Sequence, residues 1–180
     1  TPFFVSRLKE SPEWADSVGT RILNSSQPRS DDFLPAAVVL ARLASVSGSI
    51  ADKLAQQATT GTDEQKLLAL GALCEHLTRE AYFEFGRQNG IGPDRYLRAA
   101  ARCWGGTGGI ELISILEESQ EEHLEEGAGR ALVREWSRNQ EDSDLIATVD
   151  YLFERAQPGF DSYITDIIEN IRKRRPSTLE

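Results

Sequence analysis

The sequence predicts an all-α protein of eight to nine mostly antiparallel helices, and three observations support this prediction. Between residues 62 and 171 the apolar residues recur every three or four positions, which is the spacing of one helical face. No segment shows the strict alternation that a half-buried strand requires. Glycine, proline and capping residues separate the periodic segments. The length of 180 residues fits one helical domain over residues 1–180, as a compact bundle or a short α-solenoid.

Three helices are expected in the N-terminal third, after a frayed segment at residues 1–10. Ser11 and Pro12 have the order of an N-cap followed by proline at the first helical position, and they open a helix that ends near Leu23. The segment 33–44 is apolar nearly all the way round, so we expect it to be surrounded by other helices. Gly48 interrupts this segment, and Ile50, Leu54 and Ala58 then mark a short amphipathic helix that stops before Gly61.

A long helix is expected over residues 62–86. Thr62 and Gln65 have the spacing of a capping box, in which each side chain accepts a hydrogen bond from the other residue's backbone N–H. Apolar residues then continue at helical spacing as far as Phe85. Pro93 opens the next helix, which ends at Trp104 before a glycine-rich run at residues 105–109.

The last third is expected to hold three further amphipathic segments after a short helix at 110–116. Residues 119–122 have the form of a second capping box, which would start a helix that reaches Trp136. Asp142 or Ser143 caps the next helix, whose apolar residues are Leu145, Ile146, Val149, Leu152, Phe153 and Ala156. Throughout the chain the periodicity assigns nearly every large apolar side chain to the core. The final helix carries one clean apolar face and ends in a basic run, with a frayed tail at residues 173–180.

The leucine and alanine spacing in residues 63–77 and 110–136 is similar to that of HEAT-type helix pairs. No fixed repeat period relates one pair to the next, and no diagnostic motif is present. The sequence therefore leaves both a bundle and a solenoid open.

Charge and composition narrow the possible partners. The net charge of −9 and the pI of about 4.8 disfavour nucleic acid and anionic membranes. The longest apolar stretch, residues 33–41, is much shorter than the roughly 20 residues that span a bilayer. Cys74 and Cys103 lie in helical apolar patterns and form no Cys-x-x-Cys pair, which fits a reduced, cytoplasmic location. The start of the chain lacks a signal-peptide pattern and is expected to be a trimmed end or part of a longer protein.

The glycine-rich run is one candidate binding site. Successive backbone N–H groups at a helix N-terminus can hold an anion, which makes Gly106, Thr107, Gly108 and Gly109 candidate ligands, with Arg102 nearby in the sequence. A phosphate-binding fingerprint would follow a strand, whereas a helix precedes this run. A turn between closely packed helices is the simpler interpretation.

The two histidines suggest a metal site as a second candidate. His123 and Glu126 are three residues apart, so on one helix they would share a face and supply two ligands. A di-metal bundle needs a second Glu-x-x-His pair, and His76 has none. Cys74 and His76 are two positions apart and would point to different faces of a helix. We therefore expect no cofactor.

Two functions remain open after these sequence observations. The first is a non-catalytic interaction module, an adaptor, regulatory or inhibitory domain, which presents an acidic surface to a protein partner with a basic surface. Its candidate contact residues are Glu118, Glu121, Glu122 and Glu125. The second is a helical-bundle enzyme or a metal- or anion-binding domain, with a site among His76, Glu80, His123 and Glu126 or at the glycine-rich run. The absence of a convergent set of catalytic residue types favours the first.

Overall fold

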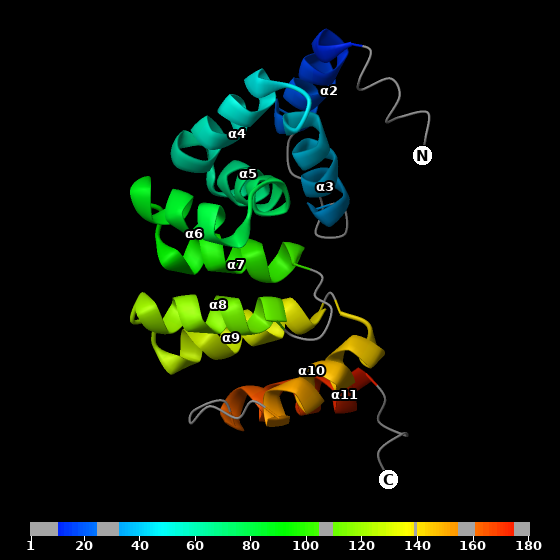
Figure 1. Cartoon of the computed structure of the whole chain (residues 1–180), viewed down its shortest axis with the longest axis vertical. Coiled ribbons are helices and arrows are strands. Elements are labelled where there is room, and N and C mark those ends of the chain that lie inside the picture. Colours follow the sequence, from blue (N-terminus) through cyan, green and yellow to red (C-terminus); the bar gives the residue numbers. More distant parts are fainter. Residues whose placement is uncertain (1–10, 25–32, 105–109, 139, 155–160, 175–180) are drawn as a thin grey trace. The chain divides into compact units, whose positions relative to one another are not determined.

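The computed structural model is all-α, as the periodicity predicts (Figure 1). It describes residues 11–24, 33–104, 110–138, 140–154 and 161–174, which form ten helices and no strand. The predicted count of eight to nine helices is therefore too low. The helices are α2 (Pro12–Asn24), α3 (Phe33–Ala44), α4 (Gly48–Thr60), α5 (Asp63–His76), α6 (Arg79–Gln88), α7 (Pro93–Cys103), α8 (Ile110–Glu121), α9 (Glu126–Arg138), α10 (Asp142–Glu154) and α11 (Asp161–Arg174).

The helices fall into two compact units, Thr1–Ala99 and Ala100–Glu180, with the boundary inside α7. The expectation of one domain over residues 1–180 stays a prediction. None of the described helices combines the length and the apolar character needed to cross a bilayer. The predicted frayed segment at residues 1–10 lies outside the described residues. Helix α11 ends at Arg174, and the predicted frayed tail at residues 173–180 stays a prediction.

In the first unit α5 occupies the central position, which the sequence had suggested for residues 33–44. All seven residues from Leu68 to Cys74 are buried, because α3 and α4 both pack against α5. The small residues Ala69, Gly71 and Ala72 alternate with the leucines of α5, and they leave room for α3 and α4 to pack closely. The capping box at its start is present, with Gln65 N–H donating to Thr62 Oγ1 and Thr62 N–H donating to Gln65 Oε1.

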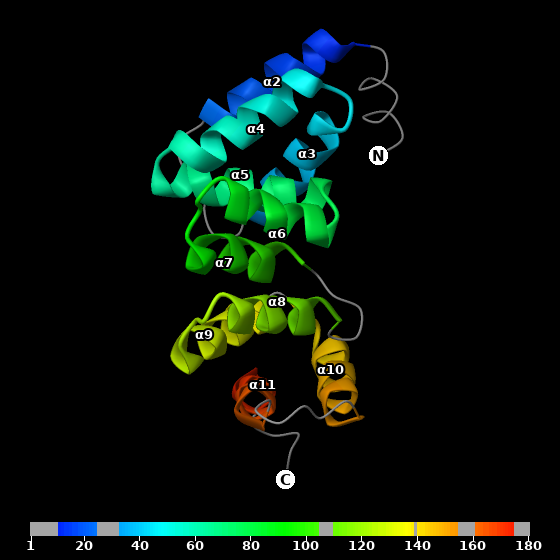
Figure 2. The same cartoon turned by 60° about the vertical axis from the view of Figure 1, so that its left-hand side comes forward.

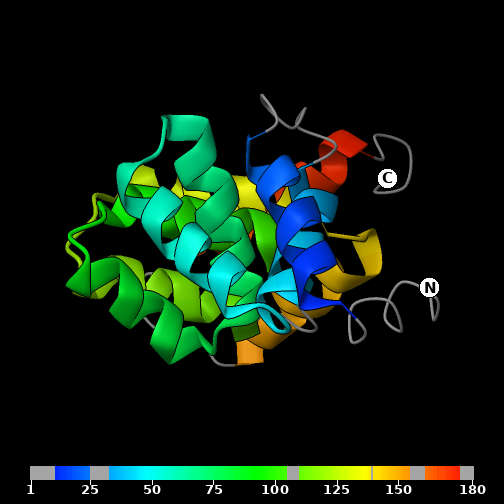
Figure 3. The same ribbon diagram turned by 90° about the horizontal axis from the view of Figure 1, so that it is seen from above.

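Helices α2 and α4 lie next to each other in the first unit (Figure 3). Lys53 Nζ on α4 donates to Asp16 Oδ1 at 3.0 Å and to Thr20 Oγ1 at 2.9 Å on α2. Hydrogen bonds from Ser49 and Lys53 lower the pKa of Asp16. Gly19 permits this approach, because a Cβ there would stand 2.5 Å from Ile50 Cδ1.

The prediction of one long helix over residues 62–86 is wrong, because the helix is interrupted at Leu77 and Thr78. Helix α5 ends at His76, and Thr78 caps α6 by accepting a hydrogen bond from the Ala81 N–H. The break redirects α6 so that its Tyr82 hydroxyl donates to the Tyr96 carbonyl of α7 at 2.8 Å.

The second predicted capping box is also wrong. Ser119 lies inside α8, where it is buried and its Oγ donates to the Leu116 carbonyl. Helix α8 continues to Glu121, and His123 turns the chain with a φ of 55° before α9 begins at Glu126. Ser119 therefore belongs to the end of one helix and does not start the next.

In the second unit α9 packs against α8 and α11, and α10 packs against α11 (Figure 2). Trp136 and Val133 of α9 and Ile167 of α11 are fully buried in this unit. Gly129 permits α11 to approach α9, because a Cβ there would stand 2.6 Å from the Tyr163 hydroxyl. Asn170 Nδ2 donates to Ser137 Oγ at 2.7 Å. Helix α11 is thus fixed to α9 by both apolar and polar contacts.

Candidate interaction surface

Helix α10 carries two apolar stripes, and one of them is exposed. Leu145, Thr148 and Leu152 are buried, and their spacing places them on one face. Ile146, Val149 and Phe153 have the same spacing one residue later, and we call them the outward ridge. Ile146 is 52% exposed and Phe153 60% exposed, with Val149 half-buried between them. Ile146 and Phe153 are therefore exceptions to the expectation that nearly every large apolar side chain is core.

Exposed large apolar side chains are otherwise scarce in the described part of the chain. The only other one is Ile110, at 44% exposure at the start of α8. A single exposed leucine or isoleucine is ordinary on a protein surface, but two on one helical face form a contiguous patch. The outward ridge is the clearest such patch among the described residues.

The charged side chains of α10 are all acidic, namely Asp142, Asp144, Asp150 and Glu154. Asp142 and Asp144 lie in the first turn, where the helix dipole favours negative charge. Glu154 lies in the last turn, where the dipole disfavours negative charge, and the described last turn has no basic residue. No ion pair joins Asp150 or Glu154 to another described residue. Among the described residues neither carboxylate therefore gains from an ion pair, and the helix dipole also disfavours Glu154.

Helix α11, on which α10 packs, is held by a two-point ion pair. Arg130 Nε and Nη2 of α9 donate to the two carboxylate oxygens of Asp166 at 2.8 and 2.7 Å. Asp166 is only 4% exposed, and its hydrogen bonds from Arg130 hold its pKa below the ordinary value, against the opposing effect of burial. No local sequence pattern indicates this pair, because its partners are 36 positions apart.

The Asp166→Asn substitution should make the second unit less stable at neutral pH. It removes the ionised partner of Arg130 and should lower the melting temperature by roughly 4–8 °C. The contribution of Asp166 is present above the unfolded-state pKa of about 3.9 and is lost as the pH falls through the lower folded-state pKa. Thermal melts of parent and variant should therefore converge as the solution is acidified below about pH 4. Glu169→Gln, which removes an exposed carboxylate from the same helix, is the control; equal effects of the two substitutions would contradict this role of Asp166.

One of the four predicted acidic contact residues is buried, and the other three lie around one turn. Glu118 is 5% exposed within α8, so it is not an outward-facing contact residue as expected. Glu121 and Glu125 are exposed and Glu122 is half-buried, around the turn between α8 and α9. A role for these three in partner binding stays a prediction.

The geometry expected for the metal pair is wrong. His123 lies in the turn after α8 with a positive φ, whereas Glu126 is the first residue of α9, so the two share no helical face. Among the described residues no group of three or more His, Cys, Asp or Glu side chains is placed to hold a metal ion. His76, at the end of α5, has its Nδ1 3.2 Å from Ser45 Oγ, and Glu80 is exposed on α6. The metal site stays a prediction without the helical pair that suggested it.

The predicted anion site, Gly106, Thr107, Gly108 and Gly109, lies outside the described residues. Arg102, which the sequence places near it, hydrogen-bonds Glu135 of α9 through its Nε. Cys74 and Cys103 are both buried, as their apolar surroundings predict.

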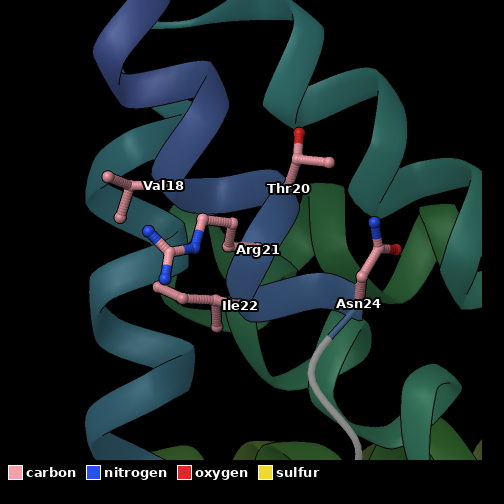
Figure 4. Close-up of a pocket in the computed structure, with 5 residues that line it drawn as sticks. All are labelled: Val18, Thr20, Arg21, Ile22 and Asn24. Carbon is pink, nitrogen blue, oxygen red and sulfur yellow. The ribbon is translucent and has the colours of Figure 1, made fainter.

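An open depression of about 550 Å³ lies against α2. Its described lining is Val18, Thr20, Arg21, Ile22 and Asn24, and Figure 4 shows Val18, Arg21 and Ile22 on one side of the helix and Thr20 and Asn24 on the other. Arg21 is its one charged side chain among these residues, and the Thr20 hydroxyl already accepts from Lys53. This lining brings no pair of titratable groups together, so the outward ridge remains the better candidate.

Comparison with known proteins found no matching family model, no matching curated protein and no matching solved structure. The interpretation of this chain therefore rests on its own residues and their arrangement.

Proposed function

We propose that this chain is a non-catalytic helical interaction module, an adaptor, regulatory or inhibitory domain, which acts in the cytoplasm and presents an acidic surface to a protein partner. The observation that carries the proposal is the outward ridge of α10. Ile146 and Phe153 are exposed there, and every charged side chain of this helix is acidic. The ridge supplies apolar area that a partner can cover, and the carboxylates favour a partner with a basic surface.

The energetics of the ridge support binding over a purely structural role. Burying apolar area contributes roughly 25 cal/mol per Å², and Ile146 and Phe153 forgo much of this in the isolated chain. The carboxylate of Glu154 in the last turn adds an unfavourable interaction with the helix dipole, and it repels the carboxylate of Asp150 four residues earlier. A basic, apolar partner relieves both costs at once, because it covers the ridge and neutralises the carboxylates.

We further propose that the helices of each unit are arranged as a short α-solenoid. Each closely packed pair among the described helices, such as α3 with α5 or α9 with α11, is one or two helices apart along the chain. Contact limited to near neighbours is the defining property of solenoids, whose surfaces commonly bind other proteins.

Affinity capture from extract of the native cell tests the proposed function. The bait is the full chain, compared with the double variant I146Q/F153Q, which makes the ridge polar while keeping good helix formers. The matched control is Ile110→Gln, which replaces the exposed isoleucine of α8. We expect a partner that binds the parent and the control, and that the double variant loses. Equal recovery of every protein by all three baits would contradict the proposal.

A further inference from the structure

We infer that the segment bound by the outward ridge is a basic amphipathic helix of a partner protein, an inference that rests on the proposed function. Ile146, Val149 and Phe153 occupy positions i, i+3 and i+7 of α10 and so form a straight row. Seven residues of helix rise roughly 10 Å, which is about two turns. A second helix presents apolar side chains at the same spacing, so its row can pack beside this one over its full length.

The acidic side chains beside the ridge favour a partner helix with a positive charge. Asp142 is four residues before Ile146, Asp150 is four residues after it, and Glu154 is next to Phe153 in the sequence. Carboxylates four residues apart, as in Asp150 and Glu154, repel each other on a helix surface. At helical spacing Asp150 and Glu154 lie on the same side of the ridge, so lysine or arginine on that side of the partner's apolar row would face them and remove the repulsion.

A second copy of this chain fits the ridge less well. In a symmetric contact each α10 would meet another α10, because such an interface uses the same patch on both copies. The acids beside the ridge, Asp142, Asp150 and Glu154, would then approach the same acids of the copy, whereas Asp144 lies on the opposite side of the helix. Like charges across an interface oppose association, so the composition of α10 disfavours this occupant.

Two synthetic peptides of about 18 residues, made only of leucine and lysine, test the inference. One has leucine at helical spacing along one face, and the other has the same composition in an order that destroys this spacing. Each is labelled and titrated with the full chain, and fluorescence anisotropy is read at low and at moderate salt. We expect the periodic peptide to bind the chain at least about tenfold more tightly than the scrambled peptide.

Three variants of the chain locate the binding. I146Q/F153Q should weaken binding of the periodic peptide by about tenfold or more, and Ile110→Gln should leave it unchanged. The double variant D150N/E154Q should weaken binding and reduce its dependence on salt, because both acids contribute to attraction.

Equal affinity for the two peptides would overturn the inference, because attraction by net charge alone would then explain binding. Sedimentation that shows self-association of the chain through the ridge, abolished by I146Q/F153Q, would also overturn it in favour of a second copy. If I146Q/F153Q binds both peptides as tightly as the parent but still loses the captured cellular partner, the inference fails and the proposed function stands. If the captured partner is also insensitive to I146Q/F153Q, the proposed function fails with it.

Discussion

Leu70→Asp should unfold the first unit. Leu70 is fully buried in the middle of α5, the helix against which α3 and α4 both pack. The substitution loses the burial of a leucine, which is worth about 2–5 kcal/mol, and places a carboxylate where the structure offers it apolar neighbours. The combined cost of about 5 kcal/mol or more is comparable with the whole stability of a small domain.

Hydrogen exchange of the backbone amides gives the clearest measurement of this effect. In the variant, the amides of α3, α4 and α5 should lose their protection together, because these helices share one core. Gln56→Asp, which introduces the same side chain at an exposed position of α4, should leave their protection nearly unchanged. Native-like protection of α5 in Leu70→Asp would show that the assignment of this core is wrong.

Ile167→Asp should have a comparable effect on the second unit. Ile167 is fully buried on α11, the helix that packs against both α9 and α10. A carboxylate at this position should cost about 5 kcal/mol or more and detach α11 from α9. Trp136 of α9 is also fully buried, so its fluorescence should shift to the red as water reaches it.

Ala131→Asp is the matched substitution for this experiment, because Ala131 is exposed on α9. It should reduce stability by less than about 1 kcal/mol, the difference in helix propensity between alanine and aspartate. A parent-like emission spectrum and melting curve for Ile167→Asp would mean that α11 does not pack on α9 in solution.

Local chemistry explains which parts of the fold could be predicted from the sequence. The capping box of Thr62 and Gln65 depends on residues three apart, and the structure confirms it. The break at Thr78 could not be predicted as easily, because Leu77 and Tyr82 continue the apolar spacing across it. The left-handed conformation of His123 could not be predicted from the sequence, because glycine or asparagine usually occupies such positions.

The candidate surface depends on tertiary packing that periodicity cannot resolve. Leu145 and Ile146 are adjacent, as are Leu152 and Phe153, so one broad apolar stripe contains both faces of α10. The placement of α11 decides which face is covered, and α11 is itself fixed by the pairing of Arg130 with Asp166. One signal was present in the sequence, because residues 142–154 contain four acids and no basic residue.

The central claim is that the apolar side chains divide into a set that holds the helices together and an exposed set on α10 that is left for a partner. The most direct test is the free energy of unfolding of I146Q/F153Q, measured in urea beside the parent and Ile167→Asp. Because both side chains are more than half exposed, the double variant should stay within about 1 kcal/mol of the parent, while Ile167→Asp should lose about 5 kcal/mol or more. A loss in I146Q/F153Q as large as that in Ile167→Asp would contradict the account, because Ile146 and Phe153 would then belong to the core.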